Sequence, residues 1–340
     1  MMRREHTDGT MQLSYSQNLE DYHLDGVFGD QKTGTYVDVG GGHPLADNVS
    51  FWFYLKGWRG LVVEAQQNLA DMYAHLRPED RVVSCLAGRM NGEAEFYAVE
   101  RLHGFSTTVR AHAEGAGRFG ATYRTIVKPV RTLASLIDDA GLGAIDFLKI
   151  DVEGAEADVL AGMDFTRHRP RVICLEAARP GDMAENVQGW EADLIAHGYA
   201  FAFDDRLNRF YVADEAKELI SRFPPEPAPW GNVLHLWDFS RAAERANHPD
   251  HTLAKLLQHG FLASLPALDP ALVRQMLERG LRETGQALTP EHAERLAGLA
   301  DPALLAAEKP ADLESLLASR RFRVALGRIA AGYDGGLILE

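Results

Sequence analysis

Acidic residues stand at or near the ends of several short apolar runs in this sequence. Asp38 lies in YVDVGGGHP, Glu64 ends the run GLVVE, Asp151 ends IDFLKID, and Glu176 ends RVICLE. If these runs are parallel strands, their carboxyl ends meet at one edge of a sheet, where open α/β sheets bind ligands. Carboxylates placed there accept hydrogen bonds from ribose hydroxyls, hold cations, or take up protons during a reaction.

The first run continues directly into Gly40, Gly41 and Gly42. A strand followed by glycines and a helix forms a tight turn that lets the backbone approach a ligand. Glu64 follows 24 residues after Gly40, close to the spacing at which an acid reaches the ribose hydroxyls of a nucleoside. Asp38 would repel a pyrophosphate and attract a cationic group, so this turn favours a sulfonium nucleoside. NAD is the second cofactor candidate, and a plain turn without a ligand is the alternative to both.

Lys149 lies inside the apolar run FLKI. Strand parity places Phe147, Lys149 and Asp151 on one face of the sheet. A buried ammonium needs a carboxylate partner, so we expect Lys149 to be held by Asp38, Asp151 or Glu176. A purely structural ion-pair network is the alternative.

The short loop GFSTT (104–108) offers hydroxyl groups to a polar acceptor. Ser106 and Thr107, with the nearby Arg110, suit a sugar and even an anionic one. An ordinary turn explains the same residues equally well.

Short apolar runs alternate with helical stretches through the first two thirds of the chain, which predicts βαβ units and a mainly parallel sheet. Predicted strands are 35–39, 60–65, 81–86, 145–151, 171–176, 199–203 and 209–213, with extra β segments at 93–99 and 123–131. Predicted helices are 14–28, 46–57, 66–76, 132–140, 154–162 and 186–197.

Three regions follow from this pattern. We expect an N-terminal helical segment (1–33), a ligand-binding α/β domain (34–222), and a Pro-rich connector with a helical C-terminal region (223–340). The last region has apolar stripes in helices predicted at 251–262, 270–282 and 289–300. These stripes would pack internally, cover the site, bind an acceptor or form a homodimer, and the sequence leaves these alternatives open. The expected fold class is therefore α/β, a Rossmann-like doubly wound sheet with a helical C-terminal appendage.

Composition limits the classes of partner. The 340 residues carry a formal net charge of −14, which argues against nucleic acid and anionic lipid as partners. The two cysteines, Cys85 and Cys174, lie in apolar runs, as expected for buried free thiols in a reducing compartment. With no secretory signal pattern and no apolar run long enough to span a membrane, we expect a cytoplasmic protein.

Taken together, the motifs resemble the FkbM-type family of S-adenosylmethionine-dependent methyltransferases. The resemblance covers roughly residues 14–215 and rests on SYSQNLED, YVDVGGGHP, GWRGLVVEA, GFSTT, FLKIDVEGAE, RPRVICLE and NRFYVADE, of which KIDVEGAE is the most distinctive. It implies a Rossmann-like methyltransferase fold and O-methylation, often of sugars or natural products. The glycine turn departs from the DVGA or DIGA that is common in the family, because Gly41, Gly42 and His43 follow Gly40 here.

The resemblance also implies roles for individual residues. Asp38, Gly40 and Gly42 would hold the methionine end of the cofactor, and Glu64 would hold the ribose. Asp151, Glu153 and Glu156 would face the methyl group and the acceptor, and Asp151 would also contact the cofactor. Gln17, Asn18 and Glu20 would close over the site, although capping or packing of the N-terminal helix explains them equally well. Apart from the resemblance, we expect Glu176, Ser106 and Thr107 on the acceptor side.

A hydroxyl acceptor needs a base, since it is a poor nucleophile at neutral pH. Asp151 or Glu153 would take the proton, with His43 or His103 as alternatives. No metal site is predicted, although Asp151, Glu153 and Glu176 could also gather around Mg²⁺ if the neighbouring lysine did not compete for them.

The function expected from sequence is thus S-adenosylmethionine-dependent methyl transfer to a hydroxyl of a sugar or saccharide-containing small molecule, such as a surface polysaccharide, glycolipid or natural-product sugar. A non-catalytic saccharide-binding or scaffolding protein is the alternative, and an NAD-dependent oxidoreductase is the third candidate.

Overall fold

The computed structural model describes residues 13–29, 31–99, 103–178, 187, 189–283 and 312–333. Its chain divides into two compact units, Met1–Asp238 and Phe239–Glu340, which are described separately below.

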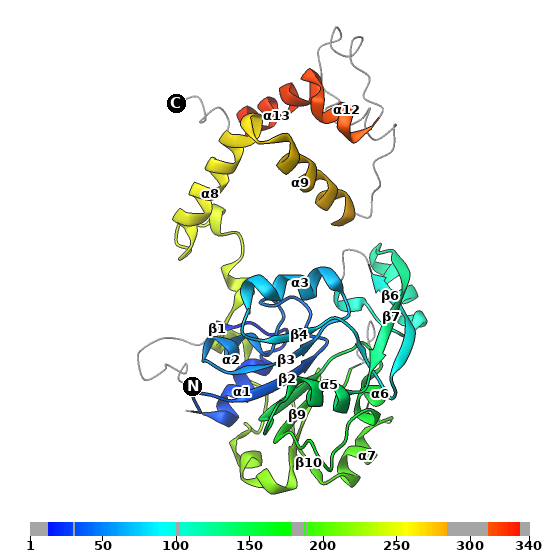
Figure 1. The fold of residues 1–340 in the computed structure, drawn as a ribbon. Coiled ribbons are helices and arrows are strands. Elements are labelled where there is room, and N and C mark those ends of the chain that lie inside the picture. The colour runs from blue at the N-terminus through cyan, green and yellow to red at the C-terminus, as the bar shows by residue number, and fades with distance from the viewer. Residues whose placement is uncertain are drawn as a thin grey trace. The chain divides into compact units, whose positions relative to one another are not determined.

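A seven-stranded, mostly parallel sheet forms the centre of the first unit (Figure 1). In spatial order its strands are β10 (Tyr199–Asp204), β11 (Asn208–Ala213), β9 (Val172–Glu176), β8 (Phe147–Ile150), β2 (Thr35–Val39), β3 (Arg59–Val63) and β4 (Arg81–Val83). All neighbours from β9 to β4 are parallel, and β11 is antiparallel to both β9 and β10. This confirms the predicted α/β fold class with a doubly wound sheet.

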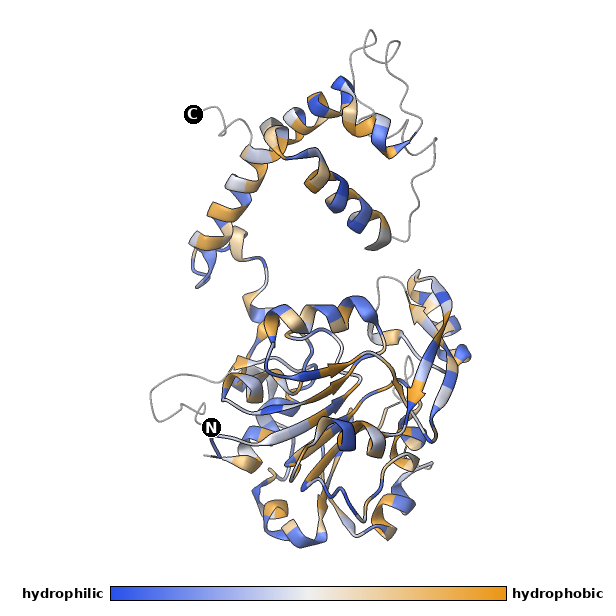
Figure 2. Ribbon diagram, in the orientation of Figure 1, coloured by the Kyte–Doolittle hydropathy of each residue, from blue (hydrophilic) through white to orange (hydrophobic). Residues whose placement is uncertain are grey.

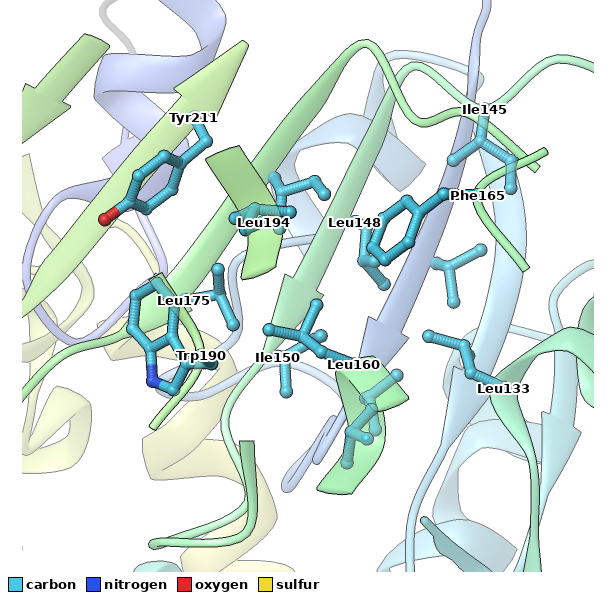
Figure 3. Packing of buried hydrophobic residues seen from close by; sticks show 14 of the residues in the cluster. Leu133, Ile145, Leu148, Ile150, Leu160, Phe165, Leu175, Trp190, Leu194 and Tyr211 are labelled. Atoms are coloured by element: carbon cyan, nitrogen blue, oxygen red, sulfur yellow. The ribbon is translucent and has the colours of Figure 1, made fainter. Parts of the chain in front are cut away.

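Helices cover both faces of this sheet, as the crossover connections between parallel strands require. They are α1 (Glu20–Phe28), α2 (Phe51–Leu55), α3 (Gln67–Leu76), α5 (Leu133–Ala140), α6 (Glu156–Ala161) and α7 (Glu191–Ala196). Strand β8 shows the two faces clearly. Leu148 and Ile150 join one hydrophobic cluster, part of which is drawn in Figure 3, while Phe147 joins the cluster on the opposite face. The predicted parity of this strand is therefore confirmed, and Lys149 shares the face of Phe147.

A smaller three-stranded sheet is inserted after β4. It consists of β5 (Leu86–Ala87), β7 (Tyr123–Arg131) and β6 (Gly92–Val99), and α4 (Arg110–Gly115) lies in the loop between β6 and β7. The strand predicted at 81–86 is therefore two strands, because the chain leaves the main sheet after Val83 and pairs with β7 from Leu86.

Several predicted helices are shorter than expected, and two of them show why. Of the segment 14–28, only α1 is helical, and the chain before it forms β1 (Leu13–Ser14), which pairs in parallel with β12 (Leu234–His235). Turns occupy most of 46–50, so only α2 remains of the helix predicted at 46–57. In both segments apolar residues recur at helical spacing, but the part of the chain before the helix is irregular and buries these residues without forming a helix.

The Pro-rich stretch after residue 222 packs onto the first unit. Phe223 is buried against Phe203 and Phe210, and the chain continues to β12 before the second unit begins at Phe239. The structure thus divides the chain sixteen residues later than the boundary expected from proline content.

The second unit is helical, as expected. It contains α8 (His251–Ser264), α9 (Pro270–Glu283), α12 (Leu313–Ala318) and α13 (Arg320–Tyr333), and the helix predicted at 289–300 lies outside the described residues. Val273, Leu316 and Phe322 are buried in a small core of this unit. Among the described residues, no helix is long and apolar enough to cross a membrane.

The glycine turn after β2 has two different constraints. Gly40 has a φ of +79°, and a Cβ there would lie 1.7 Å from the backbone oxygen of Asp151. Gly42 has a φ of +58°, but a Cβ there would meet no atom within 4 Å. Gly40 is therefore needed for close approach of β2 to the turn after β8, and Gly42 only for its backbone conformation.

We predict different outcomes for two matched substitutions. Gly40→Ala should destabilise the protein by more than about 4 kcal/mol, because backbone must move to admit the Cβ. Gly42→Ala should cost only about 1–2 kcal/mol, the strain of a left-handed L-residue. Urea unfolding of both variants measures these free energies, and equal losses would contradict the prediction.

Candidate active site

The predicted acids come from adjacent strands at one edge of the main sheet. Asp38 on β2 lies in register with Lys149 on β8, and β8 lies between β2 and β9. Glu64 follows β3, Asp151 follows β8, and Glu176 ends β9. Because these strands are parallel, their carboxyl ends bring the acids together, as the sequence predicted.

Asp38 is held by a chain of hydrogen bonds that runs from Arg77 through Ser50. Ser50 donates its hydroxyl to Asp38 Oδ2 at 2.5 Å, and Arg77 Nη2 donates to Ser50 Oγ at 2.8 Å. Burial raises the pKa of Asp38 despite these contacts. Its carboxyl group therefore has a fixed orientation at the start of the turn.

Arg77 is a functional support that sequence reasoning missed. It is fully buried, forms an ion pair with Asp80 at 2.7 Å, and also donates to Tyr36 and Asn48. Its place at the end of an amphipathic helix did not indicate that the side chain turns inward. The one available signal was Asp80, an acid three residues later that could pair with it.

Glu64 closes the turn from the neighbouring strand. Its Oε2 accepts the backbone N–H of Gly42 at 2.7 Å, and its Oε1 accepts that of Gln66 at 2.6 Å. Burial, and to a smaller extent the charge of Asp38, raises the pKa of Glu64 to about 7 in spite of both bonds. Each carboxylate oxygen can accept more than one hydrogen bond, so the group retains acceptor capacity for ribose hydroxyls.

Lys149 is buried among acids, as predicted. Its Nζ donates to Asn208 Oδ1 at 2.7 Å and lies 3.3 Å from Asp151 Oδ2. Burial lowers the pKa of Lys149, but the charges of Asp151, Glu20 and other neighbours outweigh burial and leave the pKa well above its ordinary value. The amide of Asn208 in turn donates to Glu20 at 2.8 Å, which links α1 to the edge of the sheet.

Asp151, Glu153 and Glu176 form a carboxylate cluster beside this lysine. One oxygen from each lies within 4.8 Å of the others. Burial and the charge of Asp151 raise the pKa of Glu153 to about 9, and the same causes raise that of Glu176. Such a cluster could hold a cation or share protons, and its chemistry suits proton transfer.

Several predicted site residues have structural partners in this structure. His43 Nδ1 accepts the backbone N–H groups of Leu45 and Ala46, so the ring lone pair needed for a base is already engaged. Ser106 Oγ accepts the N–H of Val99, and Thr107 Oγ1 donates to the carbonyl of Glu153.

The remaining predicted site residues include some that already have hydrogen-bond partners and one that is exposed. Glu156 accepts the N–H of Gly154 at 2.9 Å, and Glu20 accepts those of Asn18 and Asn208, while Gln17 is exposed. The side chain of His103 lies outside what the structure describes. Contact of these residues with a substrate stays a prediction.

Acidic groups outnumber basic groups at this edge of the sheet, and burial raises the pKa of several of them. Asp38, Glu64, Asp151, Glu153 and Glu176 gather near one buried ammonium, since Arg77 is already neutralised by Asp80. A sulfonium nucleoside with an amino group fits this donor set better than a dinucleotide phosphate does. The open space at the Gly42 Cα is consistent with a ligand lying against the turn.

A mostly parallel sheet with glycines after its first strand and acids along its carboxyl edge defines a Rossmann-like nucleoside-binding enzyme. Residues 38–201 match the family model of the methyltransferase FkbM domain. The chain therefore carries a methyltransferase domain of the FkbM family and is an S-adenosylmethionine-dependent methyltransferase, as the sequence motifs predicted.

A solved structure of a TehB-like S-adenosylmethionine-dependent methyltransferase from Corynebacterium glutamicum is similar at 12% identity, over 58% of this chain and 86% of that chain, with a TM-score of 0.33. None of the curated proteins matches this sequence. The assignment rests on the family match and not on these two comparisons.

The raised pKa of Glu153 predicts how stability depends on pH. The folded protein keeps a proton on this carboxyl between its ordinary pKa of 4.5 and about 9, whereas the unfolded chain loses it. The contribution of Glu153 to stability is therefore greatest below about pH 4.5 and is lost as pH rises towards 9.

We expect Glu153→Gln to reduce the loss of stability between pH 5 and pH 9, measured by urea unfolding at several pH values. Glu215→Gln is the control, because Arg169 lowers the pKa of Glu215 to about 2 and moves its effect below that range. A slope unchanged by Glu153→Gln would contradict the prediction.

Proposed function

We propose that this methyltransferase transfers the methyl group to a hydroxyl oxygen of a saccharide or saccharide-containing small molecule. The observation that carries the proposal is the carboxylate of Glu153, which lies with Asp151 and Glu176 at the carboxyl edge of the sheet. A hydroxyl acceptor needs a proton acceptor in this place, whereas a thiolate or a neutral amine has less need of one.

Residues at the glycine turn would bind the cofactor. Asp38 and the backbone at Gly40 and Gly42 would hold the methionine end, and Glu64 would accept the ribose hydroxyls. When bound, S-adenosylmethionine supplies an electrophilic methyl group on a sulfonium. The protein would mainly align the acceptor oxygen with that carbon. Such alignment can lower the activation free energy by about 7–11 kcal/mol.

Glu153 is the proton acceptor that we favour over Asp151. Asp151 is engaged with Lys149 at 3.3 Å and with Glu176, whereas the Glu153 carboxyl makes no hydrogen bond within the described part of the chain. When the acceptor hydroxyl takes the methyl group, the carbon–sulfur bond of the donor would break and leave a neutral thioether, and the hydroxyl proton would pass to the Glu153 carboxylate.

A neutral sugar fits this acid-rich edge of the sheet better than an anionic one does. Arg110, the cation expected to attract an anionic acceptor, forms an ion pair with Glu114 at 2.9 Å. The family resemblance supports sugars as the acceptor class, and the unpaired buried thiols of Cys85 and Cys174 are consistent with a cytoplasmic location.

We predict that the protein binds S-adenosylmethionine, which thermal stabilisation detects. In a panel of neutral and nucleotide-linked sugars read by mass spectrometry, it should methylate neutral members in preference to the anionic, nucleotide-linked ones. kcat/KM should rise with pH and level off near 9, where Glu153 loses its proton. Glu153→Gln should lower kcat by about 10²–10⁴-fold with little change in cofactor affinity.

Other results would favour the competing functions. Stabilisation by NAD but not by the methyl donor would indicate an oxidoreductase, and binding of saccharide without turnover would indicate a binding or scaffolding protein. An Asp151→Asn variant that keeps full turnover and full cofactor affinity would show that Asp151 neither accepts the proton nor contacts the cofactor.

A homodimer formed through the C-terminal helices is the second part of the proposal. Leu253, Leu256, Leu257 and Phe261 form an outward stripe on α8, a helix that is largely hydrophobic in Figure 2, and Leu256 is 67% exposed. The stripe carries no charge, so two copies of a chain with net charge −14 can meet there without placing like charges in direct contact.

We expect a dimer in light scattering after size exclusion, and a monomer for the double variant Leu256→Asp with Leu257→Asp. Lys255→Asp, a half-buried site off the stripe on the same helix, should remain dimeric. A monomeric wild-type protein at micromolar concentration would exclude this interface.

A further inference from the structure

The turn between β8 and α6 has an unusual backbone. Glu153 has a φ of +59° and Gly154 a φ of +105°. Glycine adopts such values readily, but a glutamate in the left-handed region is strained and persists only where surrounding contacts hold it. The carboxylate that we place at the reaction centre is thus carried by a strained residue.

Two side chains from the β6–β7 hairpin hold the carbonyl of this residue. Thr107 Oγ1 donates to the Glu153 oxygen at 2.8 Å, and His112 Nδ1 lies 2.9 Å from the same oxygen. The Thr107 hydroxyl oxygen also accepts the N–H of Val109 at 2.9 Å, which directs its proton to Glu153. Since a carbonyl only accepts, the His112 contact requires a proton on Nδ1.

The ring of His112 also packs against the next residue. A Cβ on Gly154 would lie 2.5 Å from His112 Cε1, so the ring occupies the space that glycine leaves. From the opposite side, Glu156 accepts the N–H groups of Val152 and Gly154. The turn is therefore held on one side by its own helix and on the other by the inserted hairpin.

Thr107 is well placed to transmit this restraint. It is 1% exposed, and its backbone pairs with Tyr97 on β6 through two hydrogen bonds of 2.8 and 3.2 Å. The position of the Glu153 carbonyl is thus tied to the small sheet, which belongs to a different part of the chain from the β8 turn.

We propose that Thr107 and His112 are positioning residues for methyl transfer: by holding the Glu153 carbonyl, they keep its carboxylate beside those of Asp151 and Glu176. This inference rests on the proposed role of Glu153 in accepting the proton. Neither residue needs to touch the substrate, and the GFSTT loop acts through the backbone of the β8 turn.

Two variants remove the hydrogen bonds and keep the shape. Thr107→Val and His112→Phe should each lower kcat on the order of 10–100-fold, because small displacements of a reacting group are costly. The Kd for S-adenosylmethionine should change less than about twofold, and Thr107→Ser should restore the rate because it keeps the hydroxyl. Thr125→Val is the control for Thr107→Val, since Thr125 is exposed on β7 opposite the same Tyr97.

A double-mutant cycle with Glu153→Gln separates positioning from general stability. If Thr107 acts through Glu153, adding Thr107→Val to Glu153→Gln should lower kcat by less than about twofold. An equal loss in both backgrounds would overturn the inference and leave the proposed function intact. If Glu153→Gln alone keeps full turnover, the proton-acceptor role is wrong, and the positioning inference falls with it.

A crystal structure of the Thr107→Val, His112→Phe double variant gives a readout that does not depend on activity. We expect residue 153 to relax to negative φ and its carboxylate to leave the cluster. An unchanged turn would show that the hairpin does not position Glu153 and would overturn the inference.

Discussion

The burial of one ammonium group among several acids determines the organisation of this site. Lys149 lies in the central strand of the sheet, with Asn208 and Asp151 in direct contact and Glu20 and Glu176 close enough to raise its pKa. Such a charge is costly to remove from water and persists only with satisfied partners. Its partners come from α1, β8, β9 and β11, so the ammonium draws distant segments of the chain to a single edge of the sheet.

One ammonium does not balance the acids that surround it. Burial raises the pKa of Glu64 to about 7 and that of Glu153 to about 9, and the charges of neighbouring acids add to the effect of burial. A ligand with a positive charge would relieve the repulsion among these acids and displace the protons. Affinity for a sulfonium nucleoside and a basic carboxylate at the acceptor side are thus two consequences of the same charge excess.

Much of this site was predictable from sequence because it depends on strand ends. Asp38, Glu64 and Asp151 lie close to the ends of parallel strands, and the topology of an open α/β sheet then brings them together without further information. The parity of β8 was predictable for the same local reason. Arg77, Asn208 and His112 were not, because each acts through a contact far away in sequence, such as that of Lys149 with Asn208, 59 residues later.

The loop GFSTT shows the limit of reading side chains by type. Its hydroxyls suit a sugar and an ordinary turn equally well, and the sequence left both roles open. In the structure Thr107 donates to a backbone carbonyl and Ser106 accepts from one of the strands, so contact of this loop with a sugar stays a prediction. A hydroxyl in a polar loop is as suited to holding backbone as to holding substrate.

The glutamate at position 153 strains the backbone of the β8 turn but supplies a carboxylate. Glycine or asparagine would adopt a φ of +59° with less strain than glutamate does. The turn keeps a glutamate nonetheless, and two side chains from a separate sheet hold its carbonyl in place. Strain of this kind persists where the strained group is needed. Since the Glu153 carboxyl makes no hydrogen bond within the described residues that would stabilise the fold, the need is for a carboxylate presented to something outside the chain.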